Sequence, residues 1–350
     1  MPETDFLIAG QGIAGTVLAL ELIRRGQKVL VIDNGHETSS SMVAAGMWNP
    51  IVFRKLNKSW RVDELLPEME RFYRHWESEF GATFFHFKPI ARVFPAREQE
   101  NDWHSKSGEP GYEQYLADDN GEELPGIQLR FPKGFGIVKG SGYLDVPLFL
   151  ERAKQFLSDK QLLIHGTVDY NALEIGADTV KLGELTARKL IFCEGFKGAE
   201  NPWFRGLPFA NTKGELLTIT SKELPQQVIP NLGVWMLPVG NDRIKVGATF
   251  DWSDFTMLPT STARQKIEKE LGELTQVTYE IVDHQAGVRP TTRDRRPVLG
   301  FHHSHPVLGI FNGLGPKGVM NAPWSAARFC EHLIEGAELP GDVDVGRFGY

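Results

Sequence analysis

The stretch FLIAGQGIAG, residues 6–15, decides the fold of the first part of the chain. Four apolar residues, typical of a short buried strand, are followed at once by glycines at the spacing G-x-G-x-x-G. Residues 16–25 have the amphipathic pattern of a helix that ends at Gly26, and residues 28–32 repeat the buried-strand pattern. A strand, a helix and a parallel strand close with a right-handed connection. The sequence therefore predicts an α/β protein that begins as a doubly wound parallel sheet.

Each glycine of this loop has a separate physical role. Gly10 makes the tight turn, Gly12 lets the backbone approach a pyrophosphate, and Gly15 allows the helix to pack closely on the strand. The N-terminus of the helix then offers unpaired N–H groups to the anion. Asp33 ends the second strand 18 residues after Gly15, where a carboxylate can accept hydrogen bonds from a ribose. These features predict a bound dinucleotide, and the alternative is a tight turn without a ligand.

The composition narrows the classes of partner. The chain has 350 residues, a net charge of −7 and a pI near 5.9, so nucleic acid is not favoured and a small molecule is the better expectation. No export signal, no membrane span and no disulfide framework is expected, and a reducing cytoplasm fits the two cysteines, Cys193 and Cys330. The histidines at 302, 303 and 305 are interpreted as solvated loop residues, so no metal is expected.

The rhythm of alternating strands and helices is interrupted twice. A helix is expected over 60–76. Residues 84–135 look irregular, with short alternating runs such as 90–94, and strand-like runs dominate from 215 to 250. The rhythm of the start returns at 146–164 and 189–192 and near the C-terminus. We therefore expect a discontinuous nucleotide-binding domain made of residues 1–50, 140–205 and 285–350. A substrate domain is expected to occupy residues 51–139 and 206–284.

Three further segments carry a resemblance to a known family. Residues 39–47 (SSSMVAAGM), 287–300 (GVRPTTRDRRPVLG) and 312–318 (NGLGPKG) are similar to flavin-binding segments of the D-amino-acid oxidase superfamily, which includes glycine oxidase and sarcosine oxidase. Cys193-Glu194-Gly195 occupies the place of an A-x-G element, although cysteine departs from the usual alanine. No second glycine fingerprint of this quality exists for a nicotinamide cofactor, so one dinucleotide is expected.

The resemblance implies a fold, a cofactor and an activity. The fold is a Rossmann-type FAD-binding domain like that of glutathione reductase, with an interleaved α+β substrate domain on a mainly antiparallel sheet. The activity is oxidation of a carbon–nitrogen bond in a small amine or amino acid, with hydride transfer to FAD and hydrolysis of the imine. Oxygen or another electron acceptor then takes the electrons. The residues expected to contact FAD are Gly10, Gly12, Ile13, Ala14, Gly15, Asp33, Asn34, Ser40, Ser41, Ala44, Ala45, Gly46, Met47, Val168, Cys193, Glu194, Gly195, Gly313, Leu314, Gly315, Pro316, Lys317, Gly318 and Val319.

The resemblance also implies three catalytic candidates. Arg289 matches the arginine that holds the substrate carboxylate with its planar fork, and the alternative is a structural salt bridge. Lys245 matches a lysine that sits over the flavin in the sarcosine oxidase branch, and the alternative is a strand lysine that faces solvent. Lys317, before the last helix, could stabilise negative charge on the flavin. Trp48 and Trp235 are expected at the substrate, and Trp235 stands where glycine oxidases carry a tyrosine.

Two other functions stay open at this point. The segments at 292–297 and 313–318 also resemble the FAD domain of the enzyme that removes a carboxymethyl group from a tRNA wobble uridine. The acidic net charge counts against that function. A flavin-binding protein without turnover is the other alternative. The identity of the amine, the acceptor, the mode of flavin attachment and assembly into a homo-oligomer are left open.

Overall fold

The computed structural model describes residues 3–35, 39–118, 124, 126–128 and 134–350. The first strand, β1 (Glu3–Ala9), leads into α1 (Ile13–Arg24) and then β2 (Val29–Asp33). β1 pairs in parallel with β2, as the sequence predicts, and on its other side with β14 (Leu185–Phe192). The sheet runs in the order β11-β2-β1-β14-β13-β12, and β21 joins it through β14.

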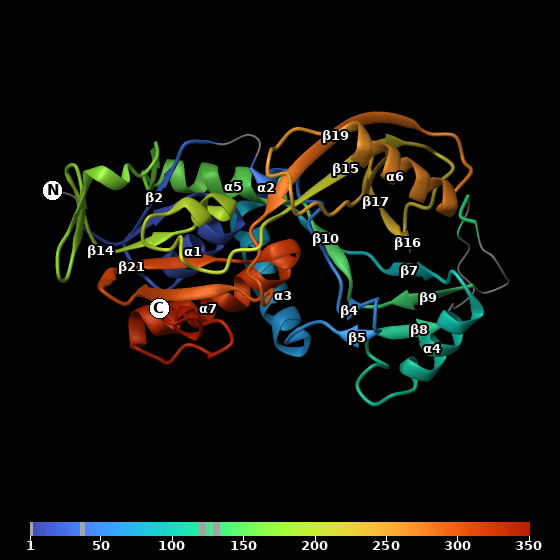
Figure 1. Ribbon diagram of the computed structural model, residues 1–350, viewed down its shortest axis with the longest axis horizontal. Helices are drawn as coiled ribbons and strands as arrows, with labels where there is room; N and C mark the ends of the chain where they lie inside the picture. Colours follow the sequence, from blue (N-terminus) through green and yellow to red (C-terminus); the bar gives the residue numbers. More distant parts are fainter. Residues whose placement is uncertain (1–2, 36–38, 119–123, 125, 129–133) are drawn as a thin grey trace.

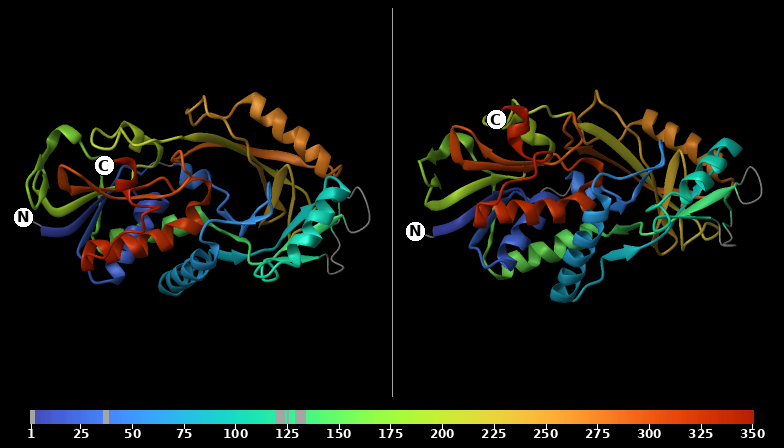
Figure 2. Two further views of the ribbon diagram at one scale, coloured as in Figure 1. Left: turned by 60° about the horizontal axis from the view of Figure 1, so that its bottom comes forward. Right: turned by 90° about the horizontal axis from the view of Figure 1, so that it is seen from below.

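Helices cover one face of this first sheet. Figure 2 shows α7 (Gly318–Glu335) beside α1 and α3 (Val62–Phe80), and α5 (Val146–Asp159) packs against α1 as well. The other face is covered by apolar residues from chain segments outside helices, among them Phe204. The remaining elements around this sheet are β11 (Leu163–His165), β12 (Leu173–Ile175), β13 (Val180–Leu182), β20 (Val298–His302) and β21 (His305–Asn312).

A second large sheet lies at the other end of the molecule (Figure 1). All of its neighbouring pairs are antiparallel except β16 with β7. Helix α6 (Ser261–Leu274) packs on one face through Ile267 and Leu271, and the opposite face looks toward the first sheet. In sheet order the strands are β19 (Glu280–Arg289), β15 (Thr212–Thr220), β18 (Arg243–Gly247), β17 (Val234–Gly240), β16 (Ile229–Leu232), β7 (Ile90–Val93), β9 (Phe135–Val138) and β8 (Leu116–Asp118).

Short elements connect the two sheets. They are α2 (Ser40–Val43), β3 (Met47–Trp48), β4 (Ile51–Val52), β5 (Asn57–Lys58), β6 (Phe85–Phe87) and β10 (Gly142–Leu144). The predicted helix at 60–76 is α3, which buries Val62, Leu65 and Trp76 on one face. The fold class is therefore the predicted one. The predicted domain boundaries stay a prediction.

One expectation about the middle of the chain is wrong. Residues 84–135, expected to be irregular apart from short alternating runs, contain β6, β8 and also α4 (Arg97–Ser107), whereas β7 coincides with the alternating run at 90–94. Helix α4 buries a single residue, Trp103, so it has no apolar periodicity that a sequence pattern could reveal. Trp103 packs over Gly136, where an added Cβ would lie 2.1 Å from its ring.

Candidate active site

The two sheets enclose a cavity of about 1040 Å³. Most of the predicted residues lie in its wall: every predicted FAD contact lines it except Gly15 and Gly313, and Arg289, Trp48 and Trp235 line it too. Gly15 and Gly313 lie behind the wall: an added Cβ at Gly15 would lie 1.8 Å from the carbonyl oxygen of Gly10, and one at Gly313 would lie 3.0 Å from Thr292. A drug-sized ligand needs a pocket of roughly 300–1000 Å³, so this space suits a dinucleotide together with a small molecule.

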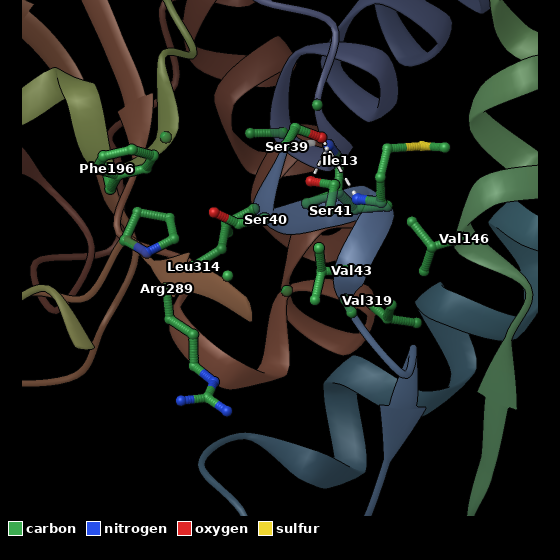
Figure 3. Close-up of a pocket in the computed structure, with 18 of the residues that line it drawn as sticks. Ile13, Ser39, Ser40, Ser41, Val43, Val146, Phe196, Arg289, Leu314 and Val319 are labelled. Carbon is green, nitrogen blue, oxygen red and sulfur yellow. Dashed lines mark hydrogen bonds between the residues drawn. The ribbon is translucent and has the colours of Figure 1, made fainter. Parts of the chain in front are cut away.

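The glycine loop presents the N-terminus of α1 to this cavity. Gly10 has a φ of +105°, which only glycine adopts without strain, and an added Cβ there would lie 2.6 Å from the carbonyl oxygen of Cys193. Gly12 is the N-cap of α1, has no side-chain cap, and is followed by no acidic residue in the first turn. The backbone N–H of Ile13 donates to Oγ of Ser41 at 3.1 Å, as Figure 3 shows. A helix start without an acidic residue, whose N-cap is a glycine, fits a pyrophosphate.

The carboxylate of Asp33 is fixed beside this loop. Its Oδ2 accepts from the backbone N–H of Gln11 at 2.8 Å, and its Oδ1 accepts from the backbone N–H of Gly35 at 2.7 Å. A carboxylate oxygen can accept more than one hydrogen bond, so both oxygens keep capacity for a donor in the cavity. This arrangement fits a ribose diol next to the pyrophosphate.

Arg289 ends β19 and lies in the wall on the side of the second sheet. Its Nη1 donates to the carbonyl oxygen of Thr249 at 3.2 Å, and its guanidinium lies 4.6 Å from the ring centroid of Phe250. Among the residues that the structure describes, no carboxylate forms an ion pair with it. Burial lowers its pKa to about 10, so it still carries its charge at neutral pH. Figure 3 shows its side chain extending away from Ser40 and Ser41.

The neighbouring strand makes room for this guanidinium at a glycine that sequence reasoning missed. An added Cβ at Gly214 would lie 1.9 Å from Nη2 of Arg289 and 2.2 Å from its central carbon. Glycine inside a strand signals a close approach of this kind, but the pattern does not say what approaches. Only the cross-strand register, in which Thr212 pairs with Arg289, identifies the partner.

We expect Gly214→Ala to weaken carboxylate binding while leaving the fold intact. The methyl group would displace the guanidinium of Arg289 from its position against β15. The arginine side chain is flexible, so it can move while the backbone stays in place. The dissociation constant of a carboxylate ligand, followed through the flavin spectrum, should rise about tenfold, the effect of a weakened hydrogen bond to a charged group. Gly272→Ala on α6, where an added Cβ meets nothing within 4 Å, is the control. Equal affinity in both variants would contradict the role of Gly214.

The two candidate lysines are placed differently. Lys317 lines the cavity at the start of α7, and its Nζ donates to Oγ of Ser59. Burial, and to a lesser degree the charge of Arg296, lowers the pKa of Lys317 to about 8, so a nearby anion would be stabilised below that pH. Lys245 lies on β18 opposite Thr218, and burial lowers its pKa, but it is not part of the cavity wall. The structure therefore brings Lys317, and not Lys245, together with the other predicted residues.

A buried lysine that the sequence analysis did not select fastens a loop over the site. Lys213 is 1% exposed, and its Nζ bonds to Asp254, to Oγ1 of Thr256 at 3.2 Å and to the carbonyl oxygen of Leu258 at 2.6 Å. This loop begins at Thr249, whose carbonyl oxygen holds Arg289. We call residues 249–258 the anchored loop. The presence of a lysine in a strand sequence does not by itself indicate that it is hydrogen-bonded to a distant loop.

We expect Lys213→Met to lower the melting temperature by several degrees and to raise the dissociation constant of a carboxylate ligand. The substitution removes the lysine charge 3.6 Å from Glu215, which is 3% exposed and keeps its contacts with His284 and Thr260, and it releases the anchored loop. Lys222→Met, at an exposed position, is the control. A loss of stability with unchanged carboxylate affinity would show that the anchored loop does not position Arg289.

The bond to Lys213 lowers the pKa of Asp254 to about 2 from an ordinary value of 3.8. A carboxyl group with a lowered pKa in the folded state stabilises the protein fully above its ordinary pKa. That contribution is lost as the pH falls through about 2. The anchored loop is thus held by a charged pair at every pH at which an enzyme is normally assayed.

Within the described ranges, no group of three or more histidine, cysteine, aspartate or glutamate side chains could hold a metal ion. No helix among the described residues is long and apolar enough to span a membrane.

Known proteins resemble this chain over almost its full length. A bifunctional ThiO/ThiG protein of Trichormus variabilis is 23% identical over 96% of the chain, but the chain spans about half (53%) of that relative. A glycine oxidase of Pseudomonas aeruginosa is 21% identical, with 95% of each protein covered. The crystal structure of glycine oxidase from Bacillus cereus superposes with a TM-score of 0.77 at 19% identity and covers 96% of each chain.

A family model also matches most of the chain. The model for FAD-dependent oxidoreductases of the DAO family matches residues 5–332. It includes the glycine loop, Asp33 and the segments at 39–47, 287–300 and 312–318. The predicted resemblance and the predicted cofactor, FAD, are thereby confirmed. The chain belongs to the DAO family of FAD-dependent oxidoreductases.

Proposed function

We propose that this protein oxidises the carbon–nitrogen bond of a small amine or amino acid that carries a carboxylate. The observation that supports this most directly is Arg289, a buried guanidinium in the cavity wall with no carboxylate partner among the described residues. A buried cation without a counter-ion is costly, and a substrate carboxylate would remove that cost. The chemistry that FAD supplies when bound is acceptance of a hydride from the carbon next to nitrogen.

The protein's own residues orient the substrate and exclude water. Arg289 holds the carboxylate, so the carbon next to it is directed toward the cofactor side of the cavity. The side chains of Trp48 and Trp235 line the same space and limit the water in it. Lys317 is cationic below its pKa of about 8 and would stabilise negative charge at the start of α7. In this proposal Lys245 has no direct contact with the substrate.

The domain division follows the same logic. We propose that residues 1–50, 140–205 and 285–350 hold FAD and that residues 51–139 and 206–284 hold the substrate. The elements of the first sheet and of the glycine loop support the first assignment, and the strands of the second sheet around Trp235 support the other.

Anaerobic bleaching of the flavin band tests the proposal. The purified protein would be mixed with glycine, sarcosine, D-proline and a panel of D- and L-amino acids and their N-alkyl derivatives. Bleaching by a carboxylate-bearing amine, but not by the amine that lacks the carboxylate, is expected. A yellow protein that none of them bleaches would overturn the proposal and favour a modified tRNA nucleoside or a flavoprotein without turnover.

A further inference from the structure

The cavity continues well beyond the carboxylate site. Its wall includes Leu216, Trp235 and Asn231 of the second sheet, and Phe53, which follows β4. These residues lie on β15, β17 and β16, progressively farther from the strand that carries Arg289. A molecule as small as glycine would occupy one end of this space only. The residues at the far end of the cavity are therefore available to contact another part of a larger substrate.

Arg92 is not itself part of the cavity wall, but it contacts Asn231 and Phe53, which form the wall at this far end. In the register of the sheet Arg92 is opposite Asn231, Asn231 is opposite Trp235, and Trp235 is opposite Gly247. Directly opposed residues of neighbouring strands share a face. The flanking Ala91 and Val93 point the other way, into the core beneath α6. The side chain of Arg92 thus projects from the same face as that of Trp235.

The guanidinium of Arg92 is half-buried and lacks a counter-ion. Its Nη1 donates to Oδ1 of Asn231 at 2.6 Å, and its central carbon lies 4.9 Å from the ring centroid of Phe53. Among the described residues, none of the ion pairs involves Arg92, whereas Arg25, Arg61 and Arg347 each have a carboxylate partner. Burial alone lowers the pKa of Arg92, as it does for Arg289.

The contacts of Arg92 leave hydrogen-bond donors for a ligand. A guanidinium has five N–H groups and no acceptor, and one of the five is bonded to Asn231. Because arginine only donates, the atom of Asn231 that it contacts must be the amide oxygen, and the NH₂ group is turned away from it. One N–H of that group is directed at the carbonyl oxygen of Val234 at 3.4 Å, and the other is left over. Two donors at one place suit an anionic oxygen group.

We propose that Arg92 and Asn231 form a second anion subsite, and that the substrate is an amino acid with an anionic group at the far end of a long side chain or N-substituent. This inference rests on the proposed function for the position of the α-carboxylate at Arg289. Both contacts of Arg92, Phe53 and Asn231, line the cavity although Arg92 itself does not, so an anion there would bind the remaining N–H of Asn231 and be stabilised by the charge of the guanidinium behind it.

The length of the substrate follows from the order of the strands. Arg289 is on β19 and Arg92 is on β7, with four strands between them. Five spacings of about 4.8 Å across the strands, with an offset of four residues (about 13 Å) along them because Arg92 is in register with Gln285, put roughly 27 Å between the two backbones, and the two arginine side chains bridge part of this gap. Aspartate and glutamate are too short to reach both cations. The middle of the path passes Leu216 and Trp235, so an apolar linker fits it.

A ligand that cannot be oxidised tests the subsite without catalysis. Dissociation constants would be measured through the flavin spectrum for α,ω-dicarboxylates from butanedioate to decanedioate, each against the monocarboxylate of equal length. We expect the longer dianions to bind about tenfold or more tightly than their monoanions, and the shortest dianion to show no preference. Equal affinities across the whole series would overturn the proposal.

Variants at position 92 test whether Arg92 causes the preference for dianions. Arg92→Met should abolish the preference for the dianion and leave the affinity for the monoanion unchanged, and Arg92→Lys should keep part of the preference because it keeps the charge but loses the fork. Arg54→Met, which removes the same charge from an exposed position near Phe53, should keep the full preference. Flavin content and melting temperature verify folding. If Arg92→Met and Arg54→Met lose the preference for the dianion equally, the preference comes from the general positive charge of this region, and the proposed subsite is overturned.

The outcomes separate this inference from the proposed function. If amines bleach the flavin but dianions show no preference, the subsite fails and the proposed function stands. If dianions are preferred through Arg92 but no amine bleaches the flavin, the subsite stands as a binding site and the proposed function fails.

Discussion

A Gly12→Val variant should fold but purify without flavin. The reason is local geometry: Gly12 has a φ of −72°, which valine accepts, and its added Cβ would meet only Oγ of Ser41, at 3.2 Å. The fold therefore tolerates a side chain at this position. The branched side chain would nevertheless cover the N-terminus of α1, where the backbone must approach the pyrophosphate. The measurement is the ratio of flavin to protein absorbance after purification, with circular dichroism and the melting temperature as tests of folding.

A second substitution in the same loop separates binding from packing. Gly15→Ala places a Cβ 1.8 Å from the carbonyl oxygen of Gly10, so the helix and strand must move apart. This variant should lose stability as well as flavin, by about 1–3 kcal/mol or more. Gly272→Val, on α6, is the control that should lose neither. Normal flavin content in Gly12→Val would refute the assignment of the loop.

The local pattern of the chain predicts the first domain well because its signals are short-range. Strand, turn and helix around Gly10 and Gly15 are fixed by neighbours in sequence, and the structure reproduces them. Asp33 follows from the same unit because β2 runs parallel to β1. Arg289 was found through a resemblance, and the structure adds that no carboxylate of the described chain pairs with it.

The rest of the site depends on which strands become neighbours. Gly214 matters only because β15 lies beside β19, and Lys213 matters only because residues 254–258 fold back over it. Arg92 and Asn231 are 139 residues apart and meet through a parallel pair of strands. No pattern within one segment encodes such pairings. Lys245 shows the converse: its segment resembles a flavin-facing strand, yet the cavity wall does not include it.

An Arg289→Ala variant should retain flavin but bind a carboxylate-bearing amine poorly. The side chain of Arg289 donates to the carbonyl oxygen of Thr249 in the anchored loop, and within the described residues no hydrogen bond joins it to the glycine loop, so its loss leaves the pyrophosphate site unchanged. The Michaelis constant should rise roughly 100-fold or more, because truncating one partner of a buried charged pair costs about 2–5 kcal/mol. Steady-state kinetics with the best substrate of the panel measure the effect.

The Arg289→Lys variant shows whether carboxylate binding depends on the planar shape of the guanidinium or on its charge alone. Arg289→Lys keeps a positive charge but cannot present two parallel N–H groups or lie flat against Phe250. If the carboxylate is held by the fork, Arg289→Lys should be nearly as impaired as Arg289→Ala. If charge alone is required, the lysine variant should recover most of the affinity. In either case an amine without a carboxylate should react with the wild type and the variants equally slowly. If Arg289→Ala leaves the Michaelis constant unchanged, Arg289 does not bind the substrate, and the guanidinium is held by Thr249 for structural reasons alone.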